Sequence, residues 1–146
     1  MKNYFDQSGL KLTIILTVLG FFAHSAQAVD DLCKEGKKNL SGDYEVLQTK
    51  GGLWGYMEQT SGLKEKSTMG LVADSKLQRA IVIFDTLCAS DKKPDQDTYN
   101  KIQKELMTAK SIHGKGVGKA PVTDIITSIE ALNKSLDELL KTLEPK

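Results

Sequence analysis

Near the C-terminus, apolar residues recur at alternating spacings of four and three residues, and this spacing constrains the fold more than any other feature. It places the apolar side chains on one stripe of an α-helix. We therefore predict a helix that Thr123 caps and that ends near Leu143. The stripe either packs inside a helical bundle, which we favour, or pairs with a second copy of the chain. The stripe consists of Ile125, Ile129, Leu132, Leu136, Leu139 and Leu143.

The middle of the chain also shows helical periodicity, and no segment alternates as a strand would. Asp30 is the expected N-cap of one helix and Asp74 or Ser75 that of another, and residues 63–73 are expected to form a loop that passes into helix. These patterns predict an all-α fold, a small bundle of four or five helices. The predicted helices are residues 30–48, with a break near residue 41, then 53–57, 74–89, 94–113 and 123–143.

Residues 1–28 indicate a cleavable secretory signal peptide. Lys2 and Lys11 supply positive charge, residues 12–22 carry no charge, and Ala26-Gln27-Ala28 fits the A-x-A cleavage pattern. A helix that spans a bilayer needs about 20 apolar residues, so an uncleaved membrane anchor is the less favoured alternative. We predict export to the periplasm and a single mature domain over residues 29–146, not embedded in the membrane.

The charges of the mature chain balance. The full sequence has 20 Lys and Arg residues against 19 Asp and Glu residues. Lys2, Lys11 and Asp6 belong to the predicted leader, so 18 residues of each sign remain. Nucleic-acid-binding proteins usually present a clearly basic face, so this balance argues against nucleic acid as a partner.

The two cysteines, Cys33 and Cys88, are the other strong constraint. In an oxidising compartment they most simply pair with each other, and that bond would clamp the bundle. An intermolecular bridge and two free thiols are the alternatives. A metal site is not expected, because His113 is the one histidine of the mature chain and no second cysteine lies close to either cysteine.

No motif predicts catalysis or a cofactor. The segment His113–Ala120 is similar to a phosphate-binding loop, but it lacks the first glycine and the final Ser or Thr of that pattern. Helix capping and solvation explain His113 and the paired carboxylates. We therefore expect no enzyme activity and no metal. Residues 114–121 are expected to form a loop that contacts an acidic partner, through Gly114, Lys115, Gly116, Gly118 and Lys119.

Several features together resemble a known group of exported proteins. A cysteine stands in the first mature helix (Leu32-Cys33), Trp54-Gly55-Tyr56 follows, and a second cysteine ends a helix (Leu87-Cys88) before a proline-containing turn. Over residues 32–113 this order resembles the HdeA-like acid-stress chaperones and is similar to the Tai-type immunity proteins, which neutralise cell-wall amidases. The chain departs from the first group by continuing through residues 122–143. It departs from the second by having no cysteine before the Trp54-Gly55-Tyr56 patch.

The resemblance implies a non-enzymatic periplasmic protein that is clamped by a disulfide, is commonly dimeric and works by binding other proteins. It implies a structural role for Cys33, Cys88 and the Trp54-Gly55-Tyr56 patch. The partner would be unfolded clients for a chaperone, or a toxin for an immunity protein that inserts residues 114–121 or 63–70 into its cleft. A structural or assembly component of an envelope apparatus, paired through the stripe of residues 125–143, is the alternative.

Overall fold

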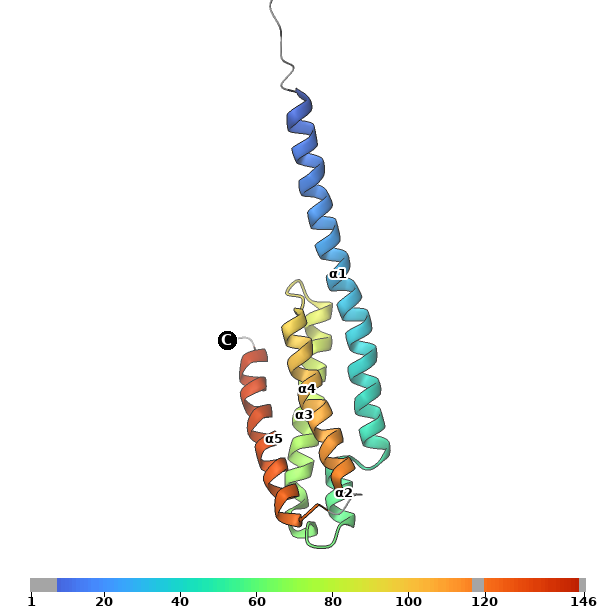
Figure 1. The fold of residues 1–146 in the computed structure, drawn as a ribbon, viewed down its shortest axis with the longest axis vertical. Coiled ribbons are helices and arrows are strands. Elements are labelled where there is room, and N and C mark those ends of the chain that lie inside the picture. Colours follow the sequence, from blue (N-terminus) through green and yellow to red (C-terminus); the bar gives the residue numbers. More distant parts are fainter. Residues whose placement is uncertain (1–7, 117–119, 145–146) are drawn as a thin grey trace, which may run out of the picture.

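The computed structural model describes residues 8–116 and 120–144, and these residues contain helices and no strand. The all-α bundle that the sequence predicts is confirmed (Figure 1). In chain order the elements are α1 (Ser8–Thr49), α2 (Gly52–Gln59), the 3-10 helix η1 (Lys64–Lys66), α3 (Ser67–Ala89), α4 (Gln96–Gly116) and α5 (Val122–Leu143).

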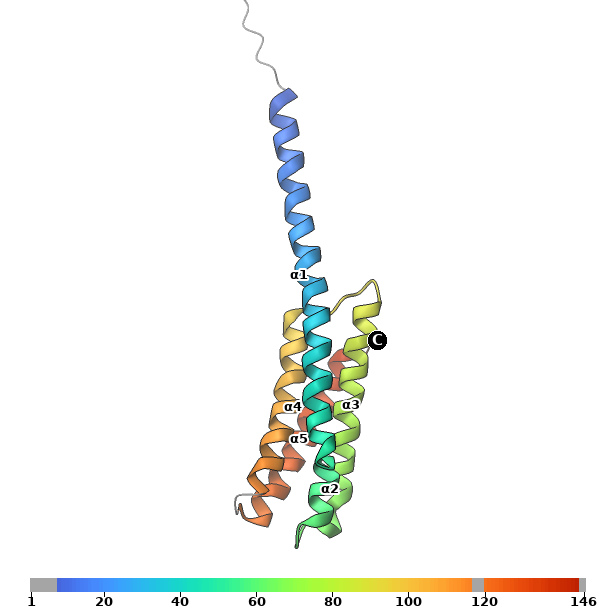
Figure 2. The same ribbon diagram turned by 90° about the vertical axis from the view of Figure 1, so that its right-hand side faces the viewer.

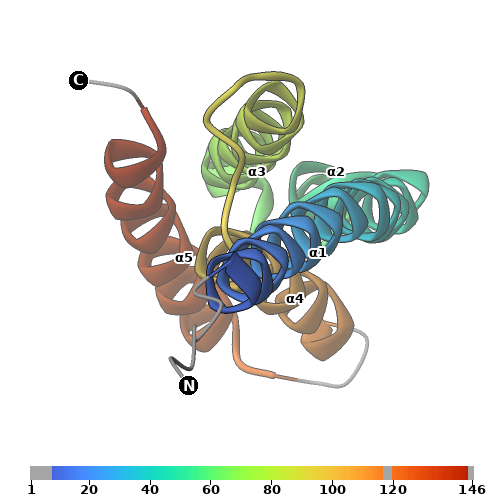
Figure 3. The ribbon, with the colours of Figure 1, turned by 90° about the horizontal axis from the view of Figure 1, so that it is seen from above.

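The long helices lie side by side, and α3 contacts each of the others. Helices α1 and α5 lie on opposite sides of the pair formed by α3 and α4 (Figure 2). The N-terminal half of α1 extends beyond the bundle. The short helix α2 packs on α3 at the other end, on the side away from α5 (Figure 3). The bundle is therefore built around α3.

The stripe on α5 lies inside this bundle. Five of its six residues are buried and Leu143 is partly buried, and α5 packs on α3 and α4. Helix α3 contributes Leu77, Ile81 and Phe84 to the core. The ring of Phe84 lies 6.0 Å from that of Tyr99 on α4. Pairing with another chain through the stripe would require α5 to leave its own core.

The disulfide between Cys33 and Cys88 is formed. It links α1 to the C-terminal end of α3, with 5.6 Å between the two Cα atoms and a sequence separation of 55. Both cysteines are buried, and no free cysteine exists in the described residues. The predicted pairing is confirmed, so the alternatives of free thiols and an intermolecular bridge are set aside.

Three predictions about the early helices were wrong: the break near residue 41, the cap at Asp30 and the start of α3. Helix α1 continues through residue 41, because Leu40 and Leu47 keep its buried face packed on the core while Gly42 is exposed. Asp30 consequently lies within α1 rather than capping it. Helix α3 begins at Ser67, seven residues earlier than Asp74, because Gly70 and Ala73 are buried and extend its packed face.

The predicted starts of the last two helices also shift. Helix α4 begins at Gln96, after Pro94, and the carboxylate of Asp95 accepts a hydrogen bond of 2.7 Å from the backbone N–H of Thr98. Asp95 is thus the N-cap residue. Helix α5 begins at Val122, and Pro121 takes the N-cap position expected of Thr123. In each case the error is within two residues, which is the usual uncertainty of a helix boundary.

Gly70 permits the closest contact between α2 and α3. A Cβ atom at this position would lie 2.7 Å from the carbonyl carbon of Leu53 and 2.8 Å from the backbone nitrogen of Trp54. We expect Gly70→Ala to push the helices apart and to lower the free energy of unfolding by about 1–3 kcal/mol. Urea titration followed by circular dichroism measures this.

Gly42→Ala is the matched control, because a Cβ atom there would have no neighbour within 4 Å. It should raise the free energy of unfolding by up to about 1 kcal/mol, since alanine favours a helix interior. Equal effects of the two substitutions would show that helix propensity, and not the contact with Leu53, controls Gly70.

Reduction of the disulfide should destabilise the protein strongly. A cross-link that closes a loop of 55 residues lowers the entropy of the unfolded chain, with an expected effect of about 4 kcal/mol. Urea titrations with and without dithiothreitol measure the difference. A variant with serine at both cysteine positions should match the reduced protein and should not respond to dithiothreitol. Unchanged stability after complete reduction would contradict the prediction.

Candidate functional site

The predicted structural patch on α2 divides between core and surface. Gly55 and Tyr56 are buried, whereas the side chain of Trp54 remains 46% exposed. The ring of Tyr56 lies 5.3 Å from that of His113 and so connects α2 to α4. Tyr56 therefore packs as a structural residue would, and the side chain of Trp54 presents an apolar surface to solvent.

Asp74 holds the start of α2 in place from a neighbouring helix. The residue is only 7% exposed, and its two carboxylate oxygens accept hydrogen bonds of 3.1 Å and 3.0 Å from the backbone N–H groups of Leu53 and Trp54. The first N–H groups of a helix have no partner within that helix, so Asp74 caps α2 across the tertiary structure. The hydroxyl of Tyr44, on α1, donates to the backbone carbonyl of Asp74 at 3.3 Å.

Burial raises the pKa of Asp74 above its ordinary value. The hydrogen bonds from Trp54 and Leu53 and the nearby imidazole of His113 act in the opposite direction and do not cancel the effect of burial. Burial likewise raises the pKa of Tyr44, and the charge of Asp74 adds to that shift. Asp74, Tyr44 and His113 lie where α1, α2, α3 and α4 meet, and their contacts stabilise the packing of these helices.

The first part of the predicted glycine–lysine loop is helical. Helix α4 continues to Gly116, so Gly114, Lys115 and Gly116 are helical, which contradicts the prediction of a loop there. His113 and Lys115 lie in its last turn, where the helix dipole favours basic side chains. Gly118 and Lys119 lie outside the described residues.

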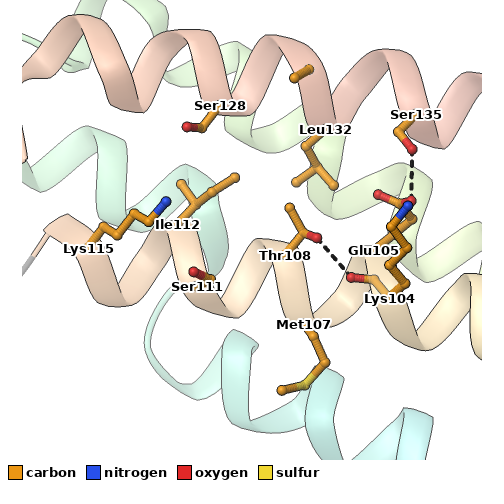
Figure 4. Close-up of a pocket in the computed structure, with 11 residues that line it drawn as sticks. Lys104, Glu105, Met107, Thr108, Ser111, Ile112, Lys115, Ser128, Leu132 and Ser135 are labelled. Atoms are coloured by element: carbon orange, nitrogen blue, oxygen red, sulfur yellow. Dashed lines mark hydrogen bonds between the residues drawn. The ribbon is translucent and has the colours of Figure 1, made fainter.

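A groove runs between α4 and α5, with a central volume of about 620 Å³ (Figure 4). Smaller cavities of about 240 Å³ and 230 Å³ share lining residues with its two ends. From Asp124 to Thr142 the groove follows α5 for about 27 Å, at 1.5 Å per residue. We call this feature the α4–α5 groove. The central part is lined by Lys104, Glu105, Met107, Thr108, Ser111, Ile112, Lys115, Ser128, Ala131, Leu132 and Ser135.

The walls of the α4–α5 groove have a defined chemistry. Its buried apolar residues are Ile112, Ile125, Leu132 and Leu139. The α4 side carries lysines and the α5 side carries carboxylates, so the two rims have opposite charge. The rim residues are Lys101, Lys104 and Lys115 on α4, and Asp124 and Glu138 on α5. Small side chains stand between rim and floor, at Ser111, Ser128, Ala131 and Ser135.

Glu105 is the buried charged residue of this groove. It is 6% exposed, and the hydroxyl of Ser135 donates a hydrogen bond of 2.7 Å to its carboxylate (Figure 4). Among the described side chains no Lys, Arg or His nitrogen lies within 4 Å of that carboxylate; the ion pairs found there use other acids. Nothing in the sequence pattern singled out Glu105, which lies on a mostly polar helix.

Side chains of the protein itself bridge a second groove, which lies between α3 and α5. Its volume is about 480 Å³. The ammonium group of Lys76 forms a 2.8 Å ion pair with Asp137 across it, and the amide of Asn133 donates to the carbonyl of Met69 at 3.0 Å. The α4–α5 groove has no such ion pair within the described residues and is the better candidate site.

The described part of the chain holds no group of three His, Cys, Asp or Glu residues placed to bind a metal ion. None of its helices combines the length and the apolar composition needed to cross a membrane.

The pKa of Asp74 gives a prediction about pH. Because its folded-state pKa is raised, the native state binds this proton more tightly than the unfolded state does. The stabilisation is therefore complete below the ordinary value of 3.8 and is lost as the pH rises through the raised folded pKa. The advantage of the wild type over Asp74→Asn should be largest in acid and should shrink towards neutral pH, as measured by urea titration at each pH. An advantage that grows with pH would show that the two backbone hydrogen bonds outweigh burial.

In comparisons with protein-family models, curated proteins and solved structures, no match was found. The resemblance to HdeA-like chaperones and Tai-type immunity proteins therefore stays a prediction. What the protein does must be argued from the α4–α5 groove and from the surface around it.

Proposed function

We propose that the protein is an exported, non-enzymatic binding protein whose partner is another protein, held in the α4–α5 groove. The observation that carries this proposal is the groove itself. It is open along two helices, has a buried apolar floor and small side chains on its walls, and is bordered by rims of opposite charge. A helix of a partner protein binds in such a groove through its apolar face.

The dimensions of the groove favour a protein segment over a small molecule. Small-molecule pockets enclose most of the surface of their ligand. The α4–α5 groove is instead long and open, and Ser128, Ala131 and Ser135 recur on α5 at spacings of three and four. Small side chains on one helix face allow another backbone to approach closely, so the groove suits an elongated partner.

The disulfide supports the proposed location in the periplasm. Disulfides persist in oxidising compartments and are rare in the cytosol. The bond between Cys33 and Cys88 is buried and joins two helices of the core. Together with the signal-like residues 1–28, it supports export and a mature domain that begins near Val29.

Of the two mechanisms that the resemblance implies, binding to one folded partner at neutral pH fits the geometry better. The groove exists in the folded bundle, so binding needs no loosening of the helices. Release of apolar surface to unfolded clients would require the buried stripe on α5 to open. We therefore favour an immunity-type role, in which the protein occupies a surface of a toxin. An assembly role through the stripe has the same difficulty as the chaperone.

A substitution that fills the groove tests the proposal. Ala131 lines the groove and is exposed, so Ala131→Arg should block a partner without disturbing the core. The purified, oxidised protein is immobilised and exposed to envelope extract at about pH 7, and again at about pH 3. We expect one stoichiometric partner at the higher pH, and at least tenfold less of it on Ala131→Arg.

Val82→Arg is the matched control, because Val82 is 55% exposed on α3 and does not line the groove. It should retain the partner fully. Equal capture by both variants would move the binding surface away from the groove. Capture of many unrelated proteins in acid alone would favour the chaperone mechanism instead.

A further inference from the structure

We propose that Glu105, together with Ser135, binds a basic side chain that the partner inserts into the α4–α5 groove. The ligand group is an arginine guanidinium or a lysine ammonium on a partner helix. This inference rests on the proposed function, and it names the chemistry by which the same groove recognises its partner.

The carboxylate of Glu105 is buried and has one hydrogen-bond donor. Buried acids are normally paired with a cation or held by several hydrogen bonds, because removing a charge from water is costly. Glu105 is 94% buried, yet a single hydroxyl donates to it and no basic group lies within 4 Å in the described structure. A cation is what this carboxylate lacks, and a bound partner can supply it.

Glu105 also lies in the wall of the groove. Glu105 and Ser135 line both the central part of the groove and its neighbouring cavity, so the carboxylate lies where a ligand would lie. Figure 4 shows Glu105 on α4 facing Ser135 on α5. The charged neighbours on these helices are Lys101, Lys104 and Glu138. Lys101 forms a 2.6 Å ion pair with Asp97, which directs its charge away from Glu105.

The cation that suits Glu105 is a basic side chain rather than a metal ion. A free metal ion would require more acidic or histidine ligands than the described residues bring together. The groove continues on both sides of Glu105, so the cation belongs to something elongated. Arginine and lysine have long stems that pack on apolar walls and a charged end that reaches inward. The exposed rims would then orient the rest of that helix, with its acids towards the rim lysines of α4 and any further bases towards the rim carboxylates of α5.

A designed peptide tests the inference without knowledge of the natural partner. The probe is an alanine-rich helical peptide of about 20 residues with one central arginine. Its twin carries citrulline, a neutral side chain of nearly the same shape, at the same place. Binding to the purified, oxidised protein is measured by NMR through the backbone amides of α4 and α5. We expect saturable binding of the arginine peptide, and binding of the citrulline twin that is weaker by about tenfold or more.

Glu105→Gln should abolish this preference, so that both peptides bind it as the citrulline twin binds the wild type. Glu130→Gln, which removes an exposed carboxylate of α5 outside the α4–α5 groove, is the matched control and should keep the preference. Glu105→Gln should also be at least as resistant to urea as the wild type, because it removes a buried charge that has no cation. A purely structural Glu105 would instead be destabilised by the change.

Several outcomes would overturn the inference. They are equal binding of the two peptides, no saturable binding, or a preference that survives in Glu105→Gln. A dimer of the protein that Glu105→Gln dissociates, seen by sedimentation, would assign the groove to a second copy. If Ala131→Arg loses the natural partner while Glu105→Gln keeps it, the proposed function stands and this inference fails. If neither variant affects capture, both fail.

Discussion

The covalent link between α1 and α3 is the constraint on which the rest of the bundle depends. Over residues 29–49, α1 offers a narrow apolar face, chiefly Leu40 and Leu47 beside Cys33. Gly36 lets α1 approach the rings of Phe84 and Tyr99, since a Cβ atom there would lie 2.9 Å from Phe84. The disulfide keeps this thin face on the core. With α1 fixed on one side of α3 and α4, α5 covers the other side.

Helical periodicity was sufficient to predict the elements whose packing is local and regular. The stripe of α5 was visible because six apolar residues recur at helical spacing, and the structure buries five of them. The start of α3 was missed for a different reason. Residues 67–73 begin with Ser67 and Thr68 and hold Gly70, and they become helical because α2 packs on them. The sequence of residues 67–73 does not indicate that α2 packs on them.

The candidate site was harder to predict than the fold, because its parts come from separate helices. Ser128, Ala131 and Ser135 recur at helical spacing beside the leucine stripe, and this row of small residues was the signal available in the sequence. Its meaning depends on Glu105, which lies 30 residues from Ser135 in the chain. The capping of α2 by Asp74 shows the same difficulty, since the carboxylate and the helix start are about 20 residues apart.

Asp74 and Glu105 are both buried acids of this small protein, and comparing them separates a structural carboxylate from a functional one. The carboxylate of Asp74 accepts hydrogen bonds from two backbone N–H groups that would otherwise have no partner. Its burial therefore stabilises the contact between α2 and α3. The carboxylate of Glu105 accepts one hydrogen bond, from the hydroxyl of Ser135. A neutral side chain at this position could form a hydrogen bond with Ser135 equally well. A negative charge there adds a desolvation cost and no gain for the fold. Such a charge is explained by a ligand that carries the opposite one, and the open groove beside Glu105 gives that ligand a path to it.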